Sequence, residues 1–368
     1  MQDIDVCVRG AGIVGRALAL ALSRHGFTVA LQAPARAATG DDVRAYALNA
    51  ESVALLQELK VWSALPADAR TAVHDMRIEG DAFGSALTFS AWEQAVRELA
   101  WIVDVPALEA ELDAALRYAP HVSRVAHAVP APLTVVAEGR AAATRESLGV
   151  DFDIEDYGQR GLAARLETDC PHAGLARQWF RAPDILALLP MDRPAAGRGY
   201  ALVWSLPAAR ADALLALDAA AFEAELMQAT GGAAGTLRLA SARAAWPLAL
   251  ARAERVAGPG WALVGDAAHL VHPLAGQGLN LGLADVATLV RVLVAREPWR
   301  ALGDERLLAR YARERAGPTL AMAQLTDGLL KLFAHPSMWA RTLRNRGLGL
   351  VQAAAPLKRW LASQAFGR

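Results

Sequence analysis

The sequence predicts an α/β protein in which a Rossmann-like domain with a parallel sheet is interleaved with a β-sheet-rich domain. Three observations carry this prediction. A strand, a glycine-rich turn and a helix follow one another at the N-terminus, residues 151–250 favour strands, and nearly everything beyond Asn280 favours helix. The simplest arrangement of these segments is a nucleotide-binding fold that resumes after a β-rich insertion and ends in a helical C-terminal segment.

The N-terminal βαβ unit contains a glycine pattern typical of dinucleotide binding. Gly10, Gly12 and Gly15 form G-x-G-x-x-G between the strand at residues 5–8 and the helix at residues 16–25. The first glycine permits the tight turn, the second lets the backbone approach a pyrophosphate, and the third packs helix against strand. The backbone at Ile13 and Val14 begins the helix, whose N-terminus favours anions.

The residues that end the first two strands depart from the usual pattern. An acidic side chain normally ends the second strand and binds an adenosine ribose. Here the position holds Gln32, which can hydrogen-bond a hydroxyl without a charge. Arg9, at the end of the first strand, either pairs with a phosphate or reaches solvent.

The middle of the chain is assigned from local patterns. We predict helices over residues 44–62, 106–118 and 218–230 and a strand over residues 132–136. The predicted domain bounds are 1–70, 101–150 and 251–295 for the nucleotide-binding domain, 71–100 and 151–250 for the β-rich domain, and 296–368 for the C-terminal helical segment.

A second chemistry-bearing segment begins where a buried strand meets Gly265 and Asp266. An aspartate at a strand end accepts hydrogen bonds from polyol hydroxyls, and the glycine-rich loop that follows can direct backbone N–H groups at a developing anion. His269 and His272 have the i, i+3 spacing of a helix face, but no nearby cluster of cysteines or carboxylates completes a metal site. We therefore predict no metal.

The composition excludes several classes of protein. Hydrophobic residues make up 54% of the 368 residues and charged residues 21%, which is a globular composition of about two domains. Cys7 and Cys170 offer no disulfide framework, as in a reducing cytoplasm. Lys+Arg and Asp+Glu both number 38, and no nucleic-acid motif is present, so nucleic-acid binding has no support. Without a signal peptide or an apolar run of about 18 residues, we expect a soluble protein, at most peripheral to a membrane.

Four separated segments resemble one family. Residues 265–266 with 273–280 (PLAGQGLN) resemble the second FAD signature of the class A FAD-dependent monooxygenases, and more narrowly of the ubiquinone-biosynthesis hydroxylase family. The other matches, in the same order as in the family, are residues 44–49 (RAYALN), 179–191 (WFRAPDILALLPM), and 357–359 with 365–367 at the C-terminus.

The resemblance implies an FAD-dependent, NAD(P)H-driven aromatic ring hydroxylase. It implies a C4a-hydroperoxyflavin that transfers one oxygen to a phenolic, polyprenylated ring, so no acid–base triad is expected because the cofactor carries the chemistry. The flavin-edge loop would comprise Pro273, Gly276, Gln277 and Gly278. The FAD contacts would be Gly10, Gly12, Ile13, Val14, Gly15, Gln32, Arg44, Glu138, Gly139, Gly265, Asp266, Leu279 and Asn280. The ring pocket is predicted around Trp179, Phe180, Leu188 and Pro190.

Three regions differ from the family pattern, and the first is Gln32. In the second, Glu138 stands where the family has aspartate and Ala142 where it has serine. In the third, the helix after Pro106 lacks the usual polar residues toward the flavin diphosphate. Two alternatives therefore stay open. One is a non-catalytic or weakly FAD-binding relative that acts as an assembly or binding protein, and the other is a different flavin oxidoreductase on the same scaffold.

The C-terminal segment is basic. Seven basic residues and no acidic residue follow Asp327, interspersed with Trp339, Trp360 and other apolar residues. Such a segment can contact the inner face of the membrane or another protein of a complex. The alternative is a pair of core-packed helices with a solvated basic face. A homo-oligomer is compatible with the sequence. Which ring position is hydroxylated, and whether NADH or NADPH donates, does not follow from the residues.

Overall fold

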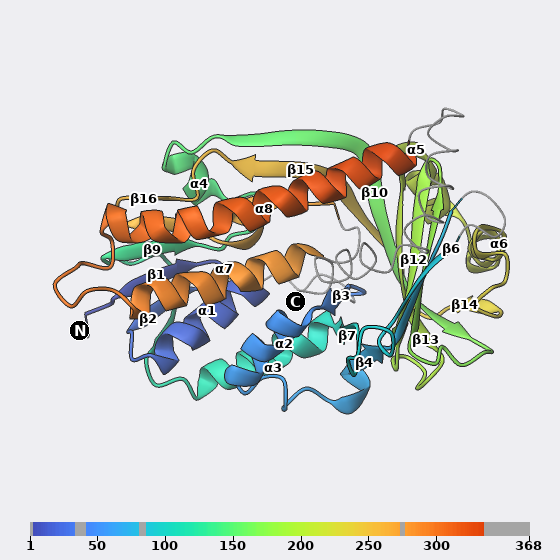
Figure 1. Ribbon diagram of the computed structural model, residues 1–368, viewed down its shortest axis with the longest axis horizontal. Coiled ribbons are helices and arrows are strands. Elements are labelled where there is room, and N and C mark those ends of the chain that lie inside the picture. The colour runs from blue at the N-terminus through green and yellow to red at the C-terminus, as the bar shows by residue number, and fades with distance from the viewer. Residues whose placement is uncertain (1–2, 34–41, 81–85, 273–276, 335–368) are drawn as a thin grey trace.

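The computed structural model describes residues 3–33, 42–80, 86–272 and 277–334 of the chain. Figure 1 shows two halves, each built on its own sheet, with helix α7 (Gln277–Val294) inside the left half. Helix α8 (Glu305–Ala334) runs along the molecule from one half to the other and contacts strands of both sheets. The two halves are therefore joined by a shared helix as well as by chain crossings.

The first half is a six-stranded sheet with the order β16-β17-β9-β1-β2-β8. All neighbouring strands are parallel except β16 and β17. The strands are short, mostly apolar and largely buried, as expected for a sheet covered on both faces. Their bounds are Val6–Arg9 (β1), Val29–Gln32 (β2), Val122–Val125 (β8), Leu133–Val136 (β9), Ala257–Gly258 (β16) and Trp261–Leu263 (β17).

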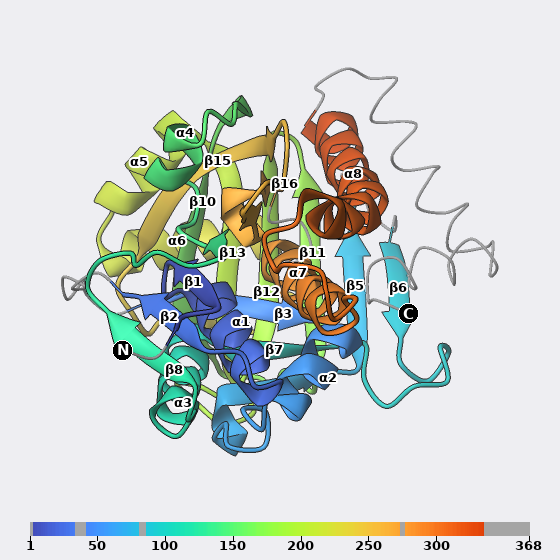
Figure 2. The ribbon, with the colours of Figure 1, turned by 90° about the vertical axis from the view of Figure 1, so that its left-hand side faces the viewer.

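Helix α1 (Ile13–Arg24) links β1 to β2 and confirms the predicted βαβ opening. It contacts α7 and α3 (Val105–Arg117), and Figure 2 shows α1 in front of the sheet with α7 above it. Helix α7 is long and apolar enough to cross a membrane by length and composition, yet 67% of that stretch is buried inside the protein. Its burial identifies it as a core helix of this domain.

The second half is a nine-stranded sheet with the order β18-β15-β10-β13-β12-β11-β5-β6, and β14 pairs with β10. Helices α5 (Ala208–Ala216) and α6 (Ala219–Thr230) cover one face of this sheet. The strands are Asp75–Glu79 (β5), Ala86–Ser90 (β6), Phe152–Thr168 (β10), Leu175–Arg181 (β11), Asp184–Met191 (β12), Gly199–Pro207 (β13), Leu237–Leu239 (β14), Ala244–Ala253 (β15) and His269–Leu270 (β18). Only β11 and β5 pair in parallel.

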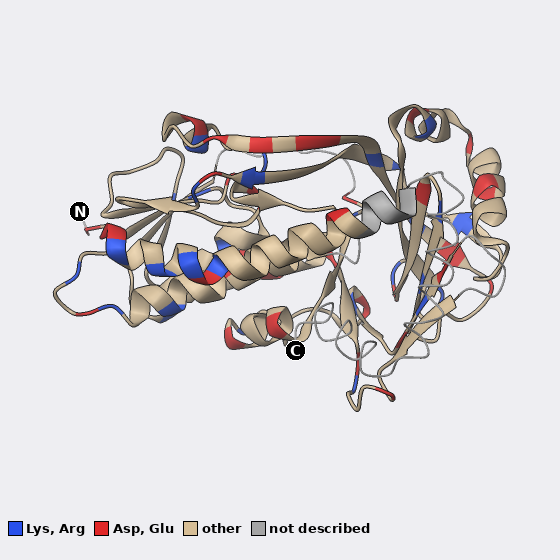
Figure 3. Ribbon diagram, turned by 45° about the horizontal axis from the view of Figure 1, so that its top comes forward, with Lys and Arg blue, Asp and Glu red and all other residues tan. Residues whose placement is uncertain are grey.

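Strand β10 begins outside the sheet as a two-stranded ribbon with β15. Residues 152–156 pair with β15 alone, and pairing with β13 starts at Gln159. Asp153, Glu155 and Asp156 are exposed there and form the acidic band along this strand in Figure 3. Charged side chains suit the exposed part of such a ribbon.

A small third sheet, β3-β7-β4, lies between the two halves. Its strands are Ala45–Leu48 (β3), Arg70–Val73 (β4) and Ala100–Asp104 (β7), and helix α2 (Ala50–Glu58) follows β3. The single helix predicted over residues 44–62 is therefore wrong in its first part. Residues 45–48 pair with β7, and the helix begins only after Asn49. The side chain of Asn49 caps the helix by accepting a hydrogen bond from the Ser52 amide.

The chain passes between the sheets several times. Strands of the six-stranded sheet come from residues 6–32, 122–136 and 257–263, and those of the nine-stranded sheet from residues 75–90, 152–253 and 269–270. Interleaving of this kind agrees with the predicted order of segments, whose individual bounds stay a prediction.

Candidate functional site

A cavity of about 890 Å³ lies where the carboxyl ends of the parallel strands face the nine-stranded sheet. Ligands bind at this edge in open α/β sheets, and the volume lies in the range of small-molecule sites. Of the predicted FAD contacts, those that line the cavity are Gly10, Gly12, Ile13, Val14, Gln32, Arg44, Glu138, Gly139, Asp266 and Leu279. Gly278 of the predicted flavin-edge loop lines it too.

The three glycines of the first motif have different physical roles. A Cβ on Gly10 would lie 2.3 Å from the carbonyl oxygen of Ala137, and one on Gly15 would lie 1.9 Å from that of Gly10. Gly10 also has φ +109°, which favours glycine. A Cβ on Gly12 would meet nothing within 4 Å and would project into open space. Gly10 and Gly15 are thus required by packing, whereas Gly12 leaves room for a ligand.

The N-terminus of α1 opens toward that space. Gly12 is its N-cap residue, and no side chain caps the first turn. Backbone N–H groups at an uncapped helix N-terminus bind phosphate well, because they carry a partial positive charge and lack partners. The 12-residue helix therefore presents the donors that a pyrophosphate needs.

Arg9, Gln32 and Glu138 form one network at the strand ends. Arg9 Nε donates to Gln32 Oε1 at 3.1 Å and lies 3.1 Å from Glu138 Oε1. Glu138 also accepts from the Thr144 hydroxyl at 2.6 Å and the Thr144 amide at 3.1 Å, at the start of α4 (Ala143–Ser147). Because Arg9 Nε only donates, the amide oxygen of Gln32 must face it, which leaves the amide NH₂ as a donor.

Arg44 occupies the cavity wall between two carboxylates. Its Nη2 lies 2.6 Å from Asp42 and 3.7 Å from Glu109 on α3. The hydrogen bond with Asp42 raises the pKa of Arg44, against the opposing effect of burial. Its charge is thus fixed at this edge of the cavity.

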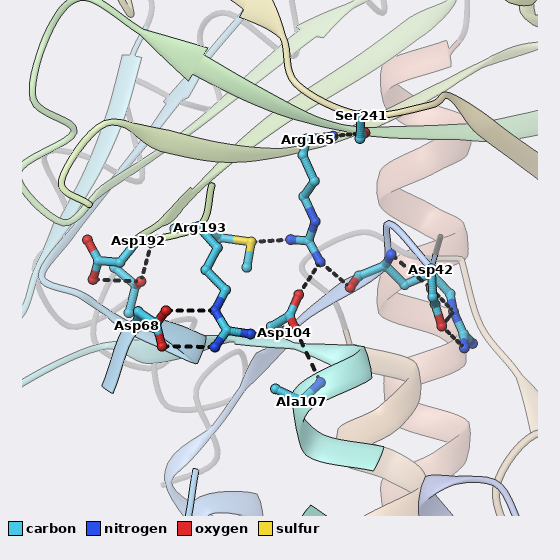
Figure 4. Close-up of polar contacts among 11 residues, drawn as sticks. Asp42, Asp68, Asp104, Ala107, Arg165, Asp192, Arg193 and Ser241 are labelled. Atoms are coloured by element: carbon cyan, nitrogen blue, oxygen red, sulfur yellow. Dashed lines mark hydrogen bonds and ion pairs between the residues drawn. The ribbon is translucent and has the colours of Figure 1, made fainter. Parts of the chain in front are cut away.

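Figure 4 shows how this region is tied to the nine-stranded sheet. Arg165 of β10 donates to the Arg44 carbonyl at 2.6 Å and to the Asp104 carboxylate at 2.7 Å. Asp104 in turn caps α3 by accepting from the Ala107 amide at 3.2 Å, and Arg193 lies 3.4 Å from it. The cluster therefore fixes the loop of Arg44 and the start of α3 to the opposite domain.

Asp266 is the carboxylate that enters the cavity. It lies in a short 3-10 turn, Gly265–Ala267, after β17. Its side chain is exposed to the cavity but lies deep within the protein, so desolvation raises its pKa against the attraction of His269 and Arg44. No described residue donates a hydrogen bond to it. A carboxylate in this state suits a ligand that supplies hydroxyl donors.

The turn that carries Asp266 is held by a buried hub that the sequence reasoning missed. Asp285 of α7 accepts from the Gly265 amide at 2.9 Å, His269 Nε2 at 2.7 Å and Arg315 Nε at 2.6 Å. Burial alone would lower the pKa of His269, but the Asp285 carboxylate raises it overall. His269 therefore acts in an ion pair within the protein, and the described residues contain no cluster of three or more potential metal ligands.

The flavin-edge loop is described only in part. Pro273 and Gly276 lie outside the described residues. Gln277 begins α7 and is buried, and Gly278 follows it at the cavity. Asn280 does not line the cavity. Its side chain donates to the Ala47 carbonyl at 2.8 Å and accepts from the Ser52 hydroxyl at 2.7 Å, so it joins α7 to β3 and α2.

The predicted ring-pocket residues do not line the cavity. Trp179 and Leu188 belong to the core under α5 and α6, and Pro190 follows the same alternation along β12. Phe180 lies on the cavity side but packs in a separate apolar cluster. The residues of this sheet that do line the cavity include Ala163, Ala176, Gln178, Ile185, Ala187, Leu189, Val203, Ser205, Trp246 and Leu248.

The correction has a simple cause. Successive side chains of a strand point to opposite faces, so choosing Trp179 and Leu188 selected the face opposite to Gln178 and Ala187. The strand pair chosen from the sequence borders the cavity, and only the register of the folded sheet shows which face meets it.

The residues present fit FAD. The open space at Gly12 and the uncapped α1 suit a pyrophosphate, Gln32 offers a donor at the ribose position, and Asp266 offers an acceptor for hydroxyls. The apolar wall of small side chains on the nine-stranded sheet leaves space for ring systems beyond these groups.

Comparisons with known proteins agree with this geometry. The FAD binding domain family matches residues 101–326, more than half of the chain. The chain is 32% identical to the ubiquinone hydroxylase UbiL of Rhodospirillum rubrum, with 99% of this chain and 89% of the relative covered. It is 31% identical to the 3-demethoxyubiquinol 3-hydroxylase of Escherichia coli, with 100% and 99% covered.

Solved structures share the fold. PqsL of Pseudomonas aeruginosa, solved with 2-aminobenzoylacetate, matches with a TM-score of 0.78 at 21% identity over 95% of this chain and 100% of that one. The p-nitrophenol 4-monooxygenase PnpA of Pseudomonas putida matches with a TM-score of 0.79 at 17% identity over 100% of both chains. With its sequence relatives and a cavity that fits the cofactor, the chain belongs to the FAD-dependent monooxygenases of the ubiquinone-biosynthesis hydroxylase family.

Proposed function

We propose that this protein hydroxylates a neutral phenolic ring that carries an apolar, polyprenyl-type chain, with NAD(P)H as the electron donor. The observation that carries the proposal is the continuity of the cavity. It extends from the dinucleotide-binding turn and Asp266 to an apolar wall on the nine-stranded sheet, so cofactor and ring share one space.

The bound FAD, once reduced, supplies the activation of O₂ and the oxygen transfer. The chain's own residues bind and orient. The α1 N-terminus and Gly12 hold the diphosphate, the Arg9–Gln32–Glu138 network faces the ribose, and Asp266 accepts from hydroxyls of the cofactor.

The nine-stranded sheet supplies the substrate side of the cavity. The small side chains of Ala163, Ala187 and Val203 leave space in the cavity, and Ile185 and Leu248 add apolar surface to its wall. Such a wall excludes water from the reacting atoms and gives space to a ring. We propose these residues as the ring pocket in place of Trp179, Phe180, Leu188 and Pro190.

The test begins with the absorption spectrum of the purified protein and titration of the apoprotein with FAD. We expect a yellow protein with near-stoichiometric FAD, and NAD(P)H oxidation accelerated by alkylphenols. Oxygen from ¹⁸O₂ should appear in the product. Release of all reducing equivalents as hydrogen peroxide would favour another flavin oxidoreductase, and failure to bind FAD at high micromolar concentration would favour a non-catalytic assembly protein.

Beyond Ala334 the basic C-terminal segment lies outside the described residues, and its role stays a prediction. A peripheral contact of this cytoplasmic protein with an anionic membrane predicts that the protein cosediments with anionic liposomes. The amount of bound protein should fall in high salt. Equal binding by a chain ending at Pro336 would contradict it. Size-exclusion chromatography with light scattering decides whether the protein forms a homo-oligomer.

A further inference from the structure

Gln178 is a buried amide on the cavity wall of the nine-stranded sheet. It lies in β11, pairs in register with Ala187 of β12, and that residue pairs with Val203 of β13. All three line the cavity. The side chain of Gln178 is only 9% exposed, so its remaining accessible surface lies toward the cavity.

The residues around Gln178 offer its side-chain amide few hydrogen-bond partners. The neighbouring wall residues are apolar, among them Ala176, Ala187 and Leu189. No described residue forms a hydrogen bond with its carboxamide. A polar group transferred into an apolar site is costly unless it is hydrogen-bonded, so the accessible partner for this amide is a molecule in the cavity.

Another glutamine of the same sheet shows the contrast. Gln159 in β10 is 8% exposed, almost as buried as Gln178, but it does not line the cavity. Its amide nitrogen donates to the Pro183 carbonyl at 3.5 Å. The amide oxygen of Gln159 has no partner among the described residues, but it is enclosed within the protein, whereas the amide of Gln178 faces the space where the ring is proposed to bind.

Most charged residues that line the cavity belong to the FAD-binding side. They are Arg44, Glu109, Glu138, Arg140 and Asp266. On the nine-stranded sheet, Arg177 also borders the cavity, but its side chain interacts with Tyr200, which belongs to the apolar core of the opposite face. Gln178 therefore meets a ligand as a neutral group that can both donate and accept a hydrogen bond.

We propose that Gln178 is a specificity-determining residue that hydrogen-bonds a neutral oxygen substituent of the substrate ring. A hydroxyl group uses both functions of the amide, and the bond fixes which edge of the ring faces the cofactor. This inference rests on the proposed function, because it takes the occupant of the apolar wall to be the ring that is hydroxylated.

The test compares two ligands that differ by one oxygen. The FAD-loaded full-length protein is titrated with 3-pentylphenol and with pentylbenzene, and the flavin absorption difference spectrum gives both dissociation constants. We expect wild type to prefer the phenol by about tenfold or more, because an oxygen-free ligand leaves the buried amide unpaired. Gln178→Met, which is similar in size and apolar, should abolish the preference and leave pentylbenzene affinity within about twofold.

Gln159→Met is the matched control and should keep the wild-type preference. Should Gln178→Met not fold with stoichiometric FAD, Gln178→Leu provides the same comparison. A preference for the phenol that survives in the Gln178 variant would overturn the proposal, as would a wild-type protein that does not distinguish the two ligands. Incorporation of ¹⁸O by wild type tests the proposed function separately, so either idea can fail without the other.

Discussion

At the scale of single residues, two departures from the family pattern, Gln32 and Glu138, are linked through Arg9. Gln32 lacks the charge of the usual acidic residue, but Arg9 fixes its amide oxygen and leaves its nitrogen as a donor. The same arginine neutralises Glu138, whose carboxylate is further held by Thr144. Gln32 and Glu138, which look like independent departures in the sequence, therefore share one arginine in the structure.

Loss of Arg9 should weaken FAD binding through its two partners. In Arg9→Leu, the Gln32 amide is free to rotate and the Glu138 carboxylate faces the cavity without its cation. We expect the dissociation constant for FAD to rise about tenfold, measured by flavin fluorescence. Arg124→Leu removes another arginine of the same sheet, which forms a partly exposed ion pair with Asp113. This variant should change the dissociation constant for FAD little. Equal constants for the two variants would contradict the role of Arg9.

Asp266 is expected to serve the cofactor and not the fold. Asp266→Ala should bind FAD at least tenfold more weakly, because the cofactor hydroxyls lose their acceptor. Since no described residue donates to this carboxylate, the thermal midpoint of the apoprotein should stay within a few degrees of wild type. Stoichiometric FAD in the purified variant would refute the assignment.

His272 should make stability depend on pH. It is fully buried, neither ring nitrogen has a hydrogen-bond partner among the described residues, and burial lowers its pKa to about 4. The unfolded chain binds a proton near pH 6.5 and the folded one only near pH 4, so stability falls as pH drops between these values. We expect His272 to account for a loss of about 2 kcal/mol between pH 7.5 and pH 5.

The measurement is urea unfolding of the apoprotein at both pH values, for wild type and His272→Leu. The variant should lose about 2 kcal/mol less than wild type over this interval, since its side chain does not titrate. The same pH dependence in both proteins would show that His272 is protonated in the folded state or does not govern this range.

At the scale of elements, two glycines in the first turn of α1 have different roles, one facing the cavity and the other packing against the backbone. Gly12 and Gly15 are one helical turn apart, yet a Cβ meets open space at the first and the Gly10 carbonyl at the second. The Asp285 hub has a comparable role at the other signature, since it joins α7 and α8 to the turn of Asp266.

The two glycines therefore provide a matched pair of variants. Gly15→Ala should lower the free energy of unfolding by about 1–3 kcal/mol or more, because α1 must move away from β1. Gly12→Ala should leave it within about 0.5 kcal/mol but weaken FAD binding, because its methyl group occupies the diphosphate space. Urea unfolding and FAD titration of both variants check this. A Gly12→Ala protein with unchanged FAD affinity would contradict the placement of the diphosphate.

At the scale of the whole molecule, the Arg165–Asp104 pair joins the two domains. Both side chains are about nine-tenths buried, and burial lowers the pKa of Arg165 against the attraction of Asp104. Through the Arg44 carbonyl and the cap of α3, this pair fixes the Arg44 side of the cavity to the nine-stranded sheet (Figure 4).

Breaking this pair should be costly. Arg165→Met leaves Asp104 buried with weaker compensation, and we expect a loss of about 3–5 kcal/mol in the free energy of unfolding. Arg160→Met in the same strand breaks a more exposed pair with Asp212 and should cost less than about 1 kcal/mol. Adding Asp104→Asn to Arg165→Met should recover part of the loss. Equal effects of the Arg165 and Arg160 variants in urea unfolding would show that the buried pair is not a structural link.

The local sequence determined the elements whose signals are short in range. The glycine spacing predicted β1, α1 and the cavity edge, and Asp218 and Gly231 bound α6 as its caps. These predictions succeed because turn geometry and helix caps depend on residues only a few positions apart. The pattern of Gly265 and Asp266 likewise identified the second segment that reaches the cavity.

Only the tertiary structure decided the features that depend on distant residues. Residues 45–48 form a strand because β7 pairs with them, although their own sequence favours helix. The register of β11 on β12 selects Gln178 rather than Trp179 for the cavity, and folding brings Arg9, Gln32 and Glu138 together. Asp285 becomes a hub only when α7 packs against the turn of Asp266. Strand pairing and buried ion pairs join residues far apart in the chain, so no local periodicity encodes them.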